Sequence, residues 1–181
     1  MRRIIYLLFP VTLMFLCSSA FTQSQFQTFV KALDNNGVLL NGGSTAAGHV
    51  NQIEIYSNSY GVSACPTPPC QAFQGDYSLL MSLNAATIKA RQLLLKGLHL
   101  TSVDVYYHKT SALFDYYLIH MEDVSITSVQ ESASSEIPTI SLSFTPTRIA
   151  WQYTATKSDG SAGTKTKGGW DFGTNTEWIF F

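Results

Sequence analysis

Apolar and polar residues alternate along much of the chain, and this alternation predicts β-strands. The clearest stretch is residues 139–154, where two runs place apolar side chains at every second position: Ile140, Leu142 and Phe144, then Ile149, Trp151 and Tyr153. A period of two puts one face of a strand in the core and the other in water. Because Pro146 lies between the runs and cannot donate to a ladder, we expect two strands here, with a bulge, an edge position or a break at the proline.

The same alternation predicts further strands over residues 29–33, 52–60, 77–83, 100–108, 113–121 and 124–129. Residues 61–76 are rich in proline and predict a long loop or an extended hairpin. Residues 157–169 are rich in Gly, Ser, Thr and Lys, which predicts a mobile hairpin loop. Many short strands separated by turn residues are typical of an all-β sandwich or barrel.

One stretch has the composition and the ends of a helix. Residues 85–95 are mostly good helix formers, Asn84 before them is a favoured N-cap, and Lys96 and Gly97 suit the C-terminal end. At helical spacing, one face of this stretch would carry Ala86, Ala90, Leu93 and Leu94. We therefore predict an all-β fold with one α-helix, which packs outside a two-sheet β-barrel or sandwich.

The first twenty residues have the pattern of a secretory signal. Residues 1–3 are positively charged, residues 4–17 are apolar, and Ser18–Ala20 fits a cleavage site. We predict a signal peptide over residues 1–20 and a single domain over 21–181, exported to the periplasm or the extracellular medium. A membrane anchor is the alternative, although the apolar run is short for a span of about 20 residues. Cys17 suggests a lipoprotein, but the bulky Leu16 before it opposes that reading.

Two cysteines remain after cleavage, and their spacing favours a small disulfide loop. Cys65 and Cys70 flank Pro-Thr-Pro-Pro, and export leads to an oxidising compartment. A metal site at the cysteines would need further ligands, and no second Cys or His pair lies near them in the sequence. We expect a disulfide that stiffens an exposed hairpin tip.

Charge and composition limit the possible partners. The formal net charge of −1 becomes −3 when Arg2 and Arg3 leave with the signal peptide, so nothing favours nucleic-acid binding. No membrane association is expected after cleavage. Charged residues make up 13% of the chain, against an average of about 25%. So low a charge in an aromatic-rich chain weakly indicates surface that is hidden in an assembly.

No catalytic motif stands out. The four histidines form no H-E-x-x-H motif, and neither G-x-S-x-G nor a P-loop is present. Asp104, Tyr106 and His108 share one strand face, but Asp104 and His108 lie about 13 Å apart by strand rise, too far for a hydrogen bond. We expect a polar face or a subunit contact there, and no enzyme activity, metal or cofactor.

Near the C-terminus, Trp170-Asp171 invites a carbohydrate-binding reading, since an exposed tryptophan can stack on sugars. The alternative, which we favour, is that Trp170 anchors the final hairpin and Asp171 caps a turn, because a glycine precedes the pair directly.

Several short motifs occur together in one order. The first three are residues 49–59 (HVNQIEIYSNS), 103–107 (VDVYY) and 124–128 (VSITS). The series ends with residues 141–144 (SLSF), the pattern I-x-W-x-Y of residues 149–153, residues 169–171 (GWD) and Asn175. From about residue 29 to residue 178, the chain resembles the Hcp family, the haemolysin-coregulated proteins that form the tube of type VI secretion systems.

This resemblance implies a compact barrel of two sheets with a helix at its side, without catalytic chemistry. It also implies homohexameric rings that stack into a tube, with a sheath, a spike and effectors in the ring lumen as further partners. Candidate ring-interface residues are Ser63 and Gln71 in the 61–76 segment, and Asp104, Tyr106 and His108. The alternative is a secreted monomeric module that binds surfaces or carbohydrate. A hydrolase ranks third, because no nucleophile or metal set is visible in the sequence.

Overall fold

The computed structural model describes residues 26–67, 70–110, 114–133 and 137–181. The predicted signal peptide over residues 1–20 lies outside the described residues. The elements run in this order: β1 (Phe26–Leu33), β2 (Ile53–Ser59), β3 (Val62–Ala64), β4 (Ala72–Gln74), β5 (Tyr77–Ser82), α1 (Ala85–Lys96), β6 (Leu100–Lys109), β7 (Phe114–Ser132), β8 (Thr139–Thr156), β9 (Ala162–Asp171) and β10 (Thr176–Glu177). Within the described ranges, no helix is long and apolar enough to cross a lipid bilayer.

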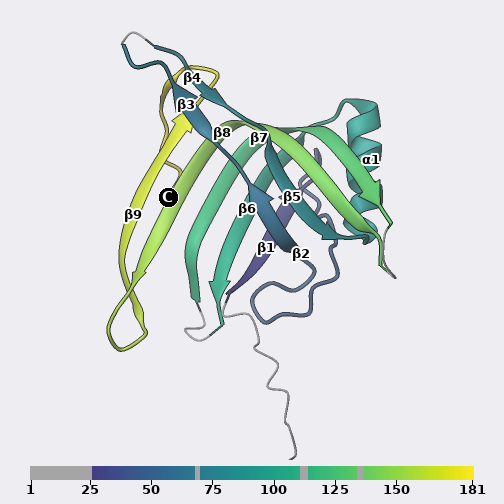
Figure 1. The fold of residues 1–181 in the computed structure, drawn as a ribbon, viewed down its shortest axis with the longest axis horizontal. Coiled ribbons are helices and arrows are strands. Elements are labelled where there is room, and N and C mark those ends of the chain that lie inside the picture. The colour runs from purple at the N-terminus through teal and green to yellow at the C-terminus, as the bar shows by residue number, and fades with distance from the viewer. Residues whose placement is uncertain (1–25, 68–69, 111–113, 134–136) are drawn as a thin grey trace, which may run out of the picture.

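Six antiparallel strands close into a barrel in the order β8-β5-β2-β1-β6-β7, because β7 also pairs with β8. Strands β9 and β10 extend the sheet beyond β8, while β3 and β4 form a separate hairpin that projects from one end of the barrel (Figure 1). This architecture confirms the predicted all-β fold with one α-helix.

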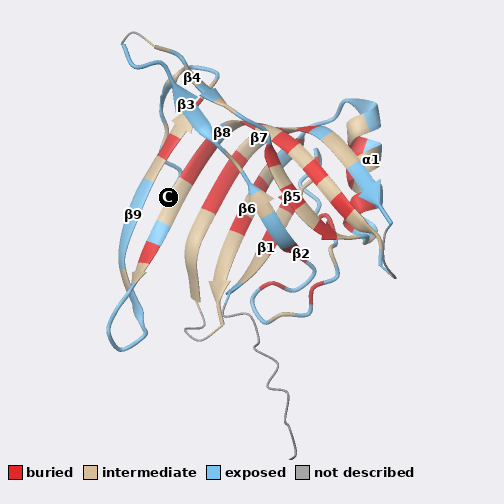
Figure 2. Cartoon of the chain, viewed as in Figure 1, coloured by how far each residue is buried: buried red, intermediate tan, exposed pale blue. Residues whose placement is uncertain are grey.

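Alternating side chains of the six strands fill the barrel. The largest wholly buried ones include Tyr77, Phe144, Ile53, Leu79, Met81, Leu100, Met121, Ile140 and Ile149. Burial of each large apolar side chain stabilises the fold by roughly 1.5–3 kcal/mol. Figure 2 shows the buried positions as bands across the barrel strands, whereas β3 and much of β9 are exposed.

Helix α1 begins and ends as its sequence predicts. The Asn84 side chain accepts the backbone N–H of Thr87 at 3.2 Å, and Gly97 ends the helix in the left-handed conformation. Ala86, Ala90 and Leu93 are buried, and Leu94 is packed against the core. The helix lies beside β7, at one side of the barrel (Figure 1).

The prediction of separate strands over 113–121 and 124–129, and of two strands within 139–154, was wrong. Each pair is one long strand, β7 or β8, and the two strands pair from Tyr117 opposite Tyr153 to Ser132 opposite Thr139. The inward face changes phase on both strands at the same place: between Met121 and Val124 on β7, and between Phe144 and Ile149 on β8. Asp123 has a positive φ of 48° at this point, so the ladder bends without breaking.

Pro146 marks a change of neighbour rather than a break. It stands opposite Val124 of β7, between the part of β8 that pairs with β5 and the part that pairs with β9. Its carbonyl accepts a hydrogen bond from the Gln74 side chain. Neither β5 nor β9 pairs with position 146, so a residue without an N–H is tolerated there.

Residues 157–169 are not a hairpin loop. A turn at residues 157–161 leads directly into β9, whose Thr166 and Lys165 stand opposite Tyr153 and Thr154 of β8. Residues 164–167, alternating Thr and Lys, are exposed on both faces of the strand. Because this stretch lacks the alternation of apolar and polar residues that marks a half-buried strand, the sequence did not reveal it. Among the described strands, β9 has no partner on its outer side except the two-residue β10.

Candidate functional site: a projecting hairpin and two covered faces of the barrel

The β3–β4 hairpin carries the first two predicted interface residues. Ser63 lies in β3 opposite Phe73, and Gln71 directly precedes β4; both are exposed. At the tip, the Cα atoms of Cys65 and Cys70 are 5.7 Å apart and their sulfurs lie at bonding distance, as the predicted disulfide requires.

Asn175 fastens this hairpin to the rest of the molecule. Its side-chain oxygen accepts the N–H of Ala72 at 2.9 Å, and its amide nitrogen donates to the carbonyl of Cys70 at 3.0 Å. Tyr60 adds a hydrogen bond to Gln74 at 3.1 Å. The hairpin is therefore held by Tyr60 at Gln74, near its base, and by Asn175 at Cys70 and Ala72, toward its tip.

A cavity of about 390 Å³ lies between the hairpin and strands β8 and β9. Its lining is mostly apolar and includes Val62, Trp151, Trp170 and Phe172. The indole nitrogen of Trp170 is the one buried side-chain N or O atom of the described residues that has no hydrogen-bond partner. Trp170 thus lines the cavity with its ring, while its indole N–H is buried without a partner.

The other predicted interface residues lie on the outer face of β6, between β1 and β7. Asp104 bonds to Nδ1 of His120 on β7 at 2.5 Å, and His108 bonds through Nδ1 to Asp115 at 3.0 Å. Each of the two residues thus has a partner of its own, and Asp104 and His108 are not bonded to each other, as their predicted separation implies. Because β6 pairs with β1 on one side and with β7 on the other, it is not an edge strand. The interface role of these half-buried residues stays a prediction.

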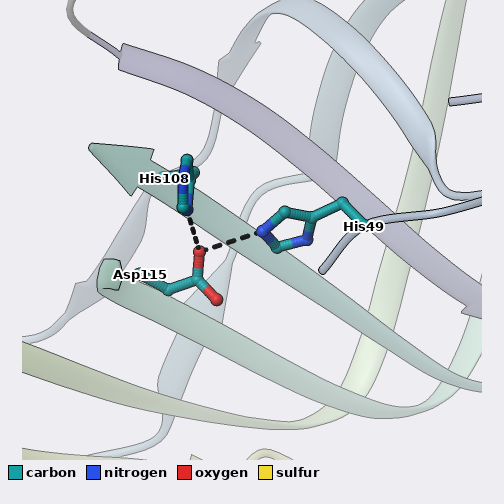
Figure 3. A group of neighbouring side chains, drawn as sticks. All are labelled: His49, His108 and Asp115. Atoms are coloured by element: carbon teal, nitrogen blue, oxygen red, sulfur yellow. Dashed lines mark hydrogen bonds and ion pairs between the residues drawn. The ribbon is translucent and has the colours of Figure 1, made fainter. Parts of the chain in front are cut away.

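The segment between β1 and β2 covers part of this outer face. His49 is buried there and stacks on Phe29 of β1, with ring centroids 4.3 Å apart and planes within 6°. Its Nε2 lies 3.1 Å from Asp115, and its Nδ1 lies 3.0 Å from Oε1 of Gln52. Figure 3 shows His49 and His108 converging on the Asp115 carboxylate.

Sequence reasoning missed this group, because His49 and Asp115 are 66 residues apart. The signal in the sequence is Phe29, a large apolar residue on the strand face opposite to Val30 and Ala32. In the structure Phe29 is wholly buried on the outer face, stacked against His49. Tyr106, beside His49, has a raised pKa because of burial first and then the Asp104 and Asp115 carboxylates.

The C-terminal segment, residues 178–181, covers the outer face of β7 and β8. Phe180 stacks on the buried His120 with ring centroids 3.6 Å apart, and Trp178 lies 5.9 Å from the Arg148 guanidinium. These contacts explain why Ala150, on the outer face of β8, is wholly buried.

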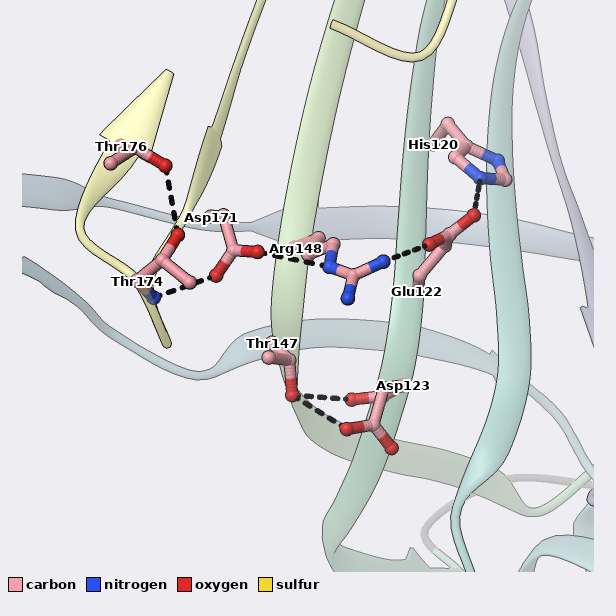
Figure 4. Close-up of polar contacts among 8 residues, drawn as sticks. All are labelled: His120, Glu122, Asp123, Thr147, Arg148, Asp171, Thr174 and Thr176. Carbon is pink, nitrogen blue, oxygen red and sulfur yellow. Dashed lines mark hydrogen bonds and ion pairs between the residues drawn. The ribbon is translucent and has the colours of Figure 1, made fainter. Parts of the chain in front are cut away.

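Arg148 joins three strands beneath that segment (Figure 4). Its Nε donates to Asp171 of β9 at 3.0 Å, and its Nη1 donates to Glu122 of β7 at 3.1 Å. Asp171 also accepts the N–H of Thr174 at 2.9 Å, as its predicted turn-capping role requires. This backbone hydrogen bond, more than Arg148, lowers the pKa of Asp171.

A Ser–His–Asp chain also lies on this surface and was not visible in the sequence. Ser125 is 3.1 Å from Nε2 of His99, whose Nδ1 is 2.7 Å from Asp123. His99 and Asp123 are both more than half exposed. Ser125 stands within the β7–β8 ladder, which occupies backbone N–H groups of the kind that build an oxyanion hole. The contacts alone therefore do not make a hydrolase site.

The comparisons with known proteins agree on one family. Residues 29–153 match the family described as "Type VI secretion system effector, Hcp". No curated protein matches the sequence.

Solved structures share the fold. One described as "Structure of a type six secretion system protein" has a TM-score of 0.76 at 21% identity, covering 84% of this chain and 99% of that one. Hcp1 from Salmonella typhimurium has a TM-score of 0.72 at 16% identity, covering 85% and 99%. A type VI secretion system effector from Yersinia pestis has a TM-score of 0.65 at 24% identity, covering 80% and 98%. By the family match over residues 29–153, the chain belongs to the Hcp family of type VI secretion proteins.

Proposed function

We propose that this chain is a structural subunit that assembles with copies of itself into homohexameric rings, which stack into the tube of a type VI-like secretion system. The observation that carries the proposal is the family match across the barrel. The solved Hcp structures support it, because this chain covers nearly all of each. The role requires no catalytic group.

Two surfaces suit the head-to-tail contacts that a closed ring needs. The first is the projecting hairpin, where Val62 and Phe73 are 53% and 56% exposed although both are large and apolar. The second is the outer edge of β9, whose backbone groups are open to a neighbouring strand along residues 162–168. A neighbouring copy would cover both.

Removal of residues 63–71 tests the hairpin's part in assembly. We expect ring yield to fall, as seen by negative-stain microscopy, while circular dichroism of the barrel is unchanged. The substitution Phe73→Ser is the milder form, and Val38→Ser is its matched control, since Val38 is 60% exposed away from the hairpin. Rings that form equally well without residues 63–71 would refute this contact.

The predicted export adds a second part to the proposal. A signal peptide over residues 1–20 would deliver the subunit to the periplasm or medium, where Cys65 and Cys70 would stay oxidised. Sheath and spike proteins, and small effectors held in the ring lumen, are the partners that a tube subunit implies. Sheath and spike genes beside this gene would support those partners, and their absence would count against them.

The alternative is an exported monomeric module that binds a surface or a carbohydrate. The cavity beside Trp151 and Trp170 favours it, because both indole rings line a mostly apolar hollow. Titration with sugars, followed by tryptophan fluorescence, tests this reading. A response that Trp170→Phe abolishes in a monomeric protein would favour the module over the ring subunit.

A further inference from the structure

We propose that His49, His108 and Asp115 bind one Zn²⁺ ion on the outer face of the barrel. The ligand atoms are Nε2 of His49, Nδ1 of His108 and a carboxylate oxygen of Asp115, and all three lie within 4.8 Å of one another. They come from three parts of the chain: the segment before β2, the end of β6 and the start of β7 (Figure 3). The proposal does not depend on ring assembly.

The distances suit a small tetrahedral ion. Asp115 Oδ1 is 3.1 Å from His49 Nε2 and 3.0 Å from His108 Nδ1. Around Zn²⁺, with bonds of about 2.0–2.2 Å, neighbouring ligand atoms are about 3.3 Å apart. The two nitrogen–oxygen separations therefore need to open by only a few tenths of an ångström, and the two imidazole nitrogens, which lie within 4.8 Å of each other, need to come to the same spacing. Two imidazoles and one carboxylate also match the ligand preferences of this ion.

His49 can bind the ion through Nε2 while its other ring nitrogen keeps a partner. Its Nδ1 lies 3.0 Å from Oε1 of Gln52. When Nε2 binds Zn²⁺, Nδ1–H donates to this oxygen, and an outer-shell hydrogen bond of this kind orients a metal-bound histidine.

The surroundings hold the first ligand in place. His49 is 4% exposed and lies flat on Phe29, while Asp115 and His108 keep side-chain exposures of 31% and 16%. The site is thus a rigid histidine with two ligands at the solvent boundary, open enough for an ion to enter. The bound ion would tie the segment before β2 to the β6–β7 end of the barrel.

Calorimetric titration of tag-free, chelator-treated protein with ZnCl₂ tests the proposal. We expect one ion per chain, and a visible tetrahedral spectrum when Co²⁺ replaces Zn²⁺. His108→Ala and Asp115→Asn should each weaken binding at least about tenfold, and Gln52→Leu roughly 10- to 100-fold. His99→Ala is the matched control, because it removes a histidine from another His–Asp pair, 2.7 Å apart, and should bind Zn²⁺ as the parent does.

A measurement on the unmodified protein keeps the test valid if a variant does not fold. Zn²⁺ should shift the ring ¹⁵N resonances of His49 and His108 and leave those of His99 and His120 in place. Absence of binding by the parent protein, equal binding by the folded His108→Ala and Asp115→Asn variants, or shifts at His99 or His120 instead would each overturn the proposal.

Discussion

The carbonyl oxygen of Trp178 packs directly against Gly169, in the space that a side chain at position 169 would occupy. The N–H of Trp178 also donates to the carbonyl of Gly169 at 3.2 Å. This close approach brings the C-terminal segment down onto β8 and β9, so that Phe180 reaches His120. One glycine of the GWD motif thus allows the chain to cover the outer face of its own barrel.

The first prediction concerns this glycine. Gly169→Ala should lower the free energy of unfolding by roughly 1–3 kcal/mol, because the new methyl group meets backbone atoms of Trp178 and Ile149. Gly168→Ala is the control: its methyl group would meet nothing within 4 Å, and the change should stay within about 0.5 kcal/mol. Urea unfolding measures both. Equal effects of the two substitutions would contradict the packing described above.

A second prediction concerns Arg148. Its guanidinium reaches carboxylates on both neighbouring strands, Glu122 and Asp171, which a single ammonium group cannot do with the same geometry. Because Arg148 is 44% exposed, we expect Arg148→Lys to cost only about 1 kcal/mol of unfolding free energy. A lysine variant as stable as the parent, measured in the same urea experiment, would show that the paired hydrogen bonds of the guanidinium are not needed for stability.

The third prediction is a pH dependence that comes from Asp34. This buried carboxylate accepts the N–H groups of Val38 and Asn36, both at 2.9 Å. These hydrogen bonds, that of Val38 foremost, with a smaller part from Lys89, hold the pKa of Asp34 below its ordinary value of 3.8 against the opposing effect of burial. Its stabilising contribution is therefore complete above the unfolded-state pKa, and is lost as the pH falls through the folded-state pKa.

Unfolding curves from neutrality to the acid side of this range test that assignment. Asp34→Asn should flatten the acid limb of the stability profile. Lys89→Met should keep most of the dependence of the unfolding free energy on pH, because the backbone hydrogen bonds lower the pKa of Asp34 more than Lys89 does. A profile for Asp34→Asn that runs parallel to that of the parent would assign the acid sensitivity to other carboxylates.

The fourth prediction concerns Cys65 and Cys70. Replacement of both by serine should cost at most about 2 kcal/mol of unfolding free energy, because the closed loop is short. Limited proteolysis should cut the hairpin sooner while the barrel stays intact, because the disulfide ties the β3 side of the tip to Cys70, whereas Asn175 holds Cys70 and Ala72 on the β4 side. Cutting that begins in the barrel instead would mean that the disulfide acts beyond the hairpin.

The sequence predicted most elements well, because local rules determine them. Asn84 and Gly97 mark the ends of the helix through capping chemistry alone. Strict alternation identified β2, β5 and β6 to within two residues. The errors in β7 and β8 have one cause: a bend shared by two paired strands shifts the phase of alternation, and within one sequence such a shift looks like a gap.

The covered outer faces could not be predicted in the same way. His49, Asp115 and Phe29 meet because the segment before β2 folds over the barrel, and this contact depends on tertiary packing rather than on spacing. The face of Asp104, Tyr106 and His108 was expected to be a polar face or a subunit contact, yet Asp104 and His108 already have partners within the chain. Alternation shows which face avoids the core, but not what lies over it.

The most direct test of the central claim is light scattering on a sizing column, with protein exported and purified in its oxidised form. The proposed function predicts a discrete species near six subunits that negative-stain microscopy shows as a ring. A monomer that persists at high protein concentration would contradict it, and attention would then turn to ligands for the cavity beside Trp170.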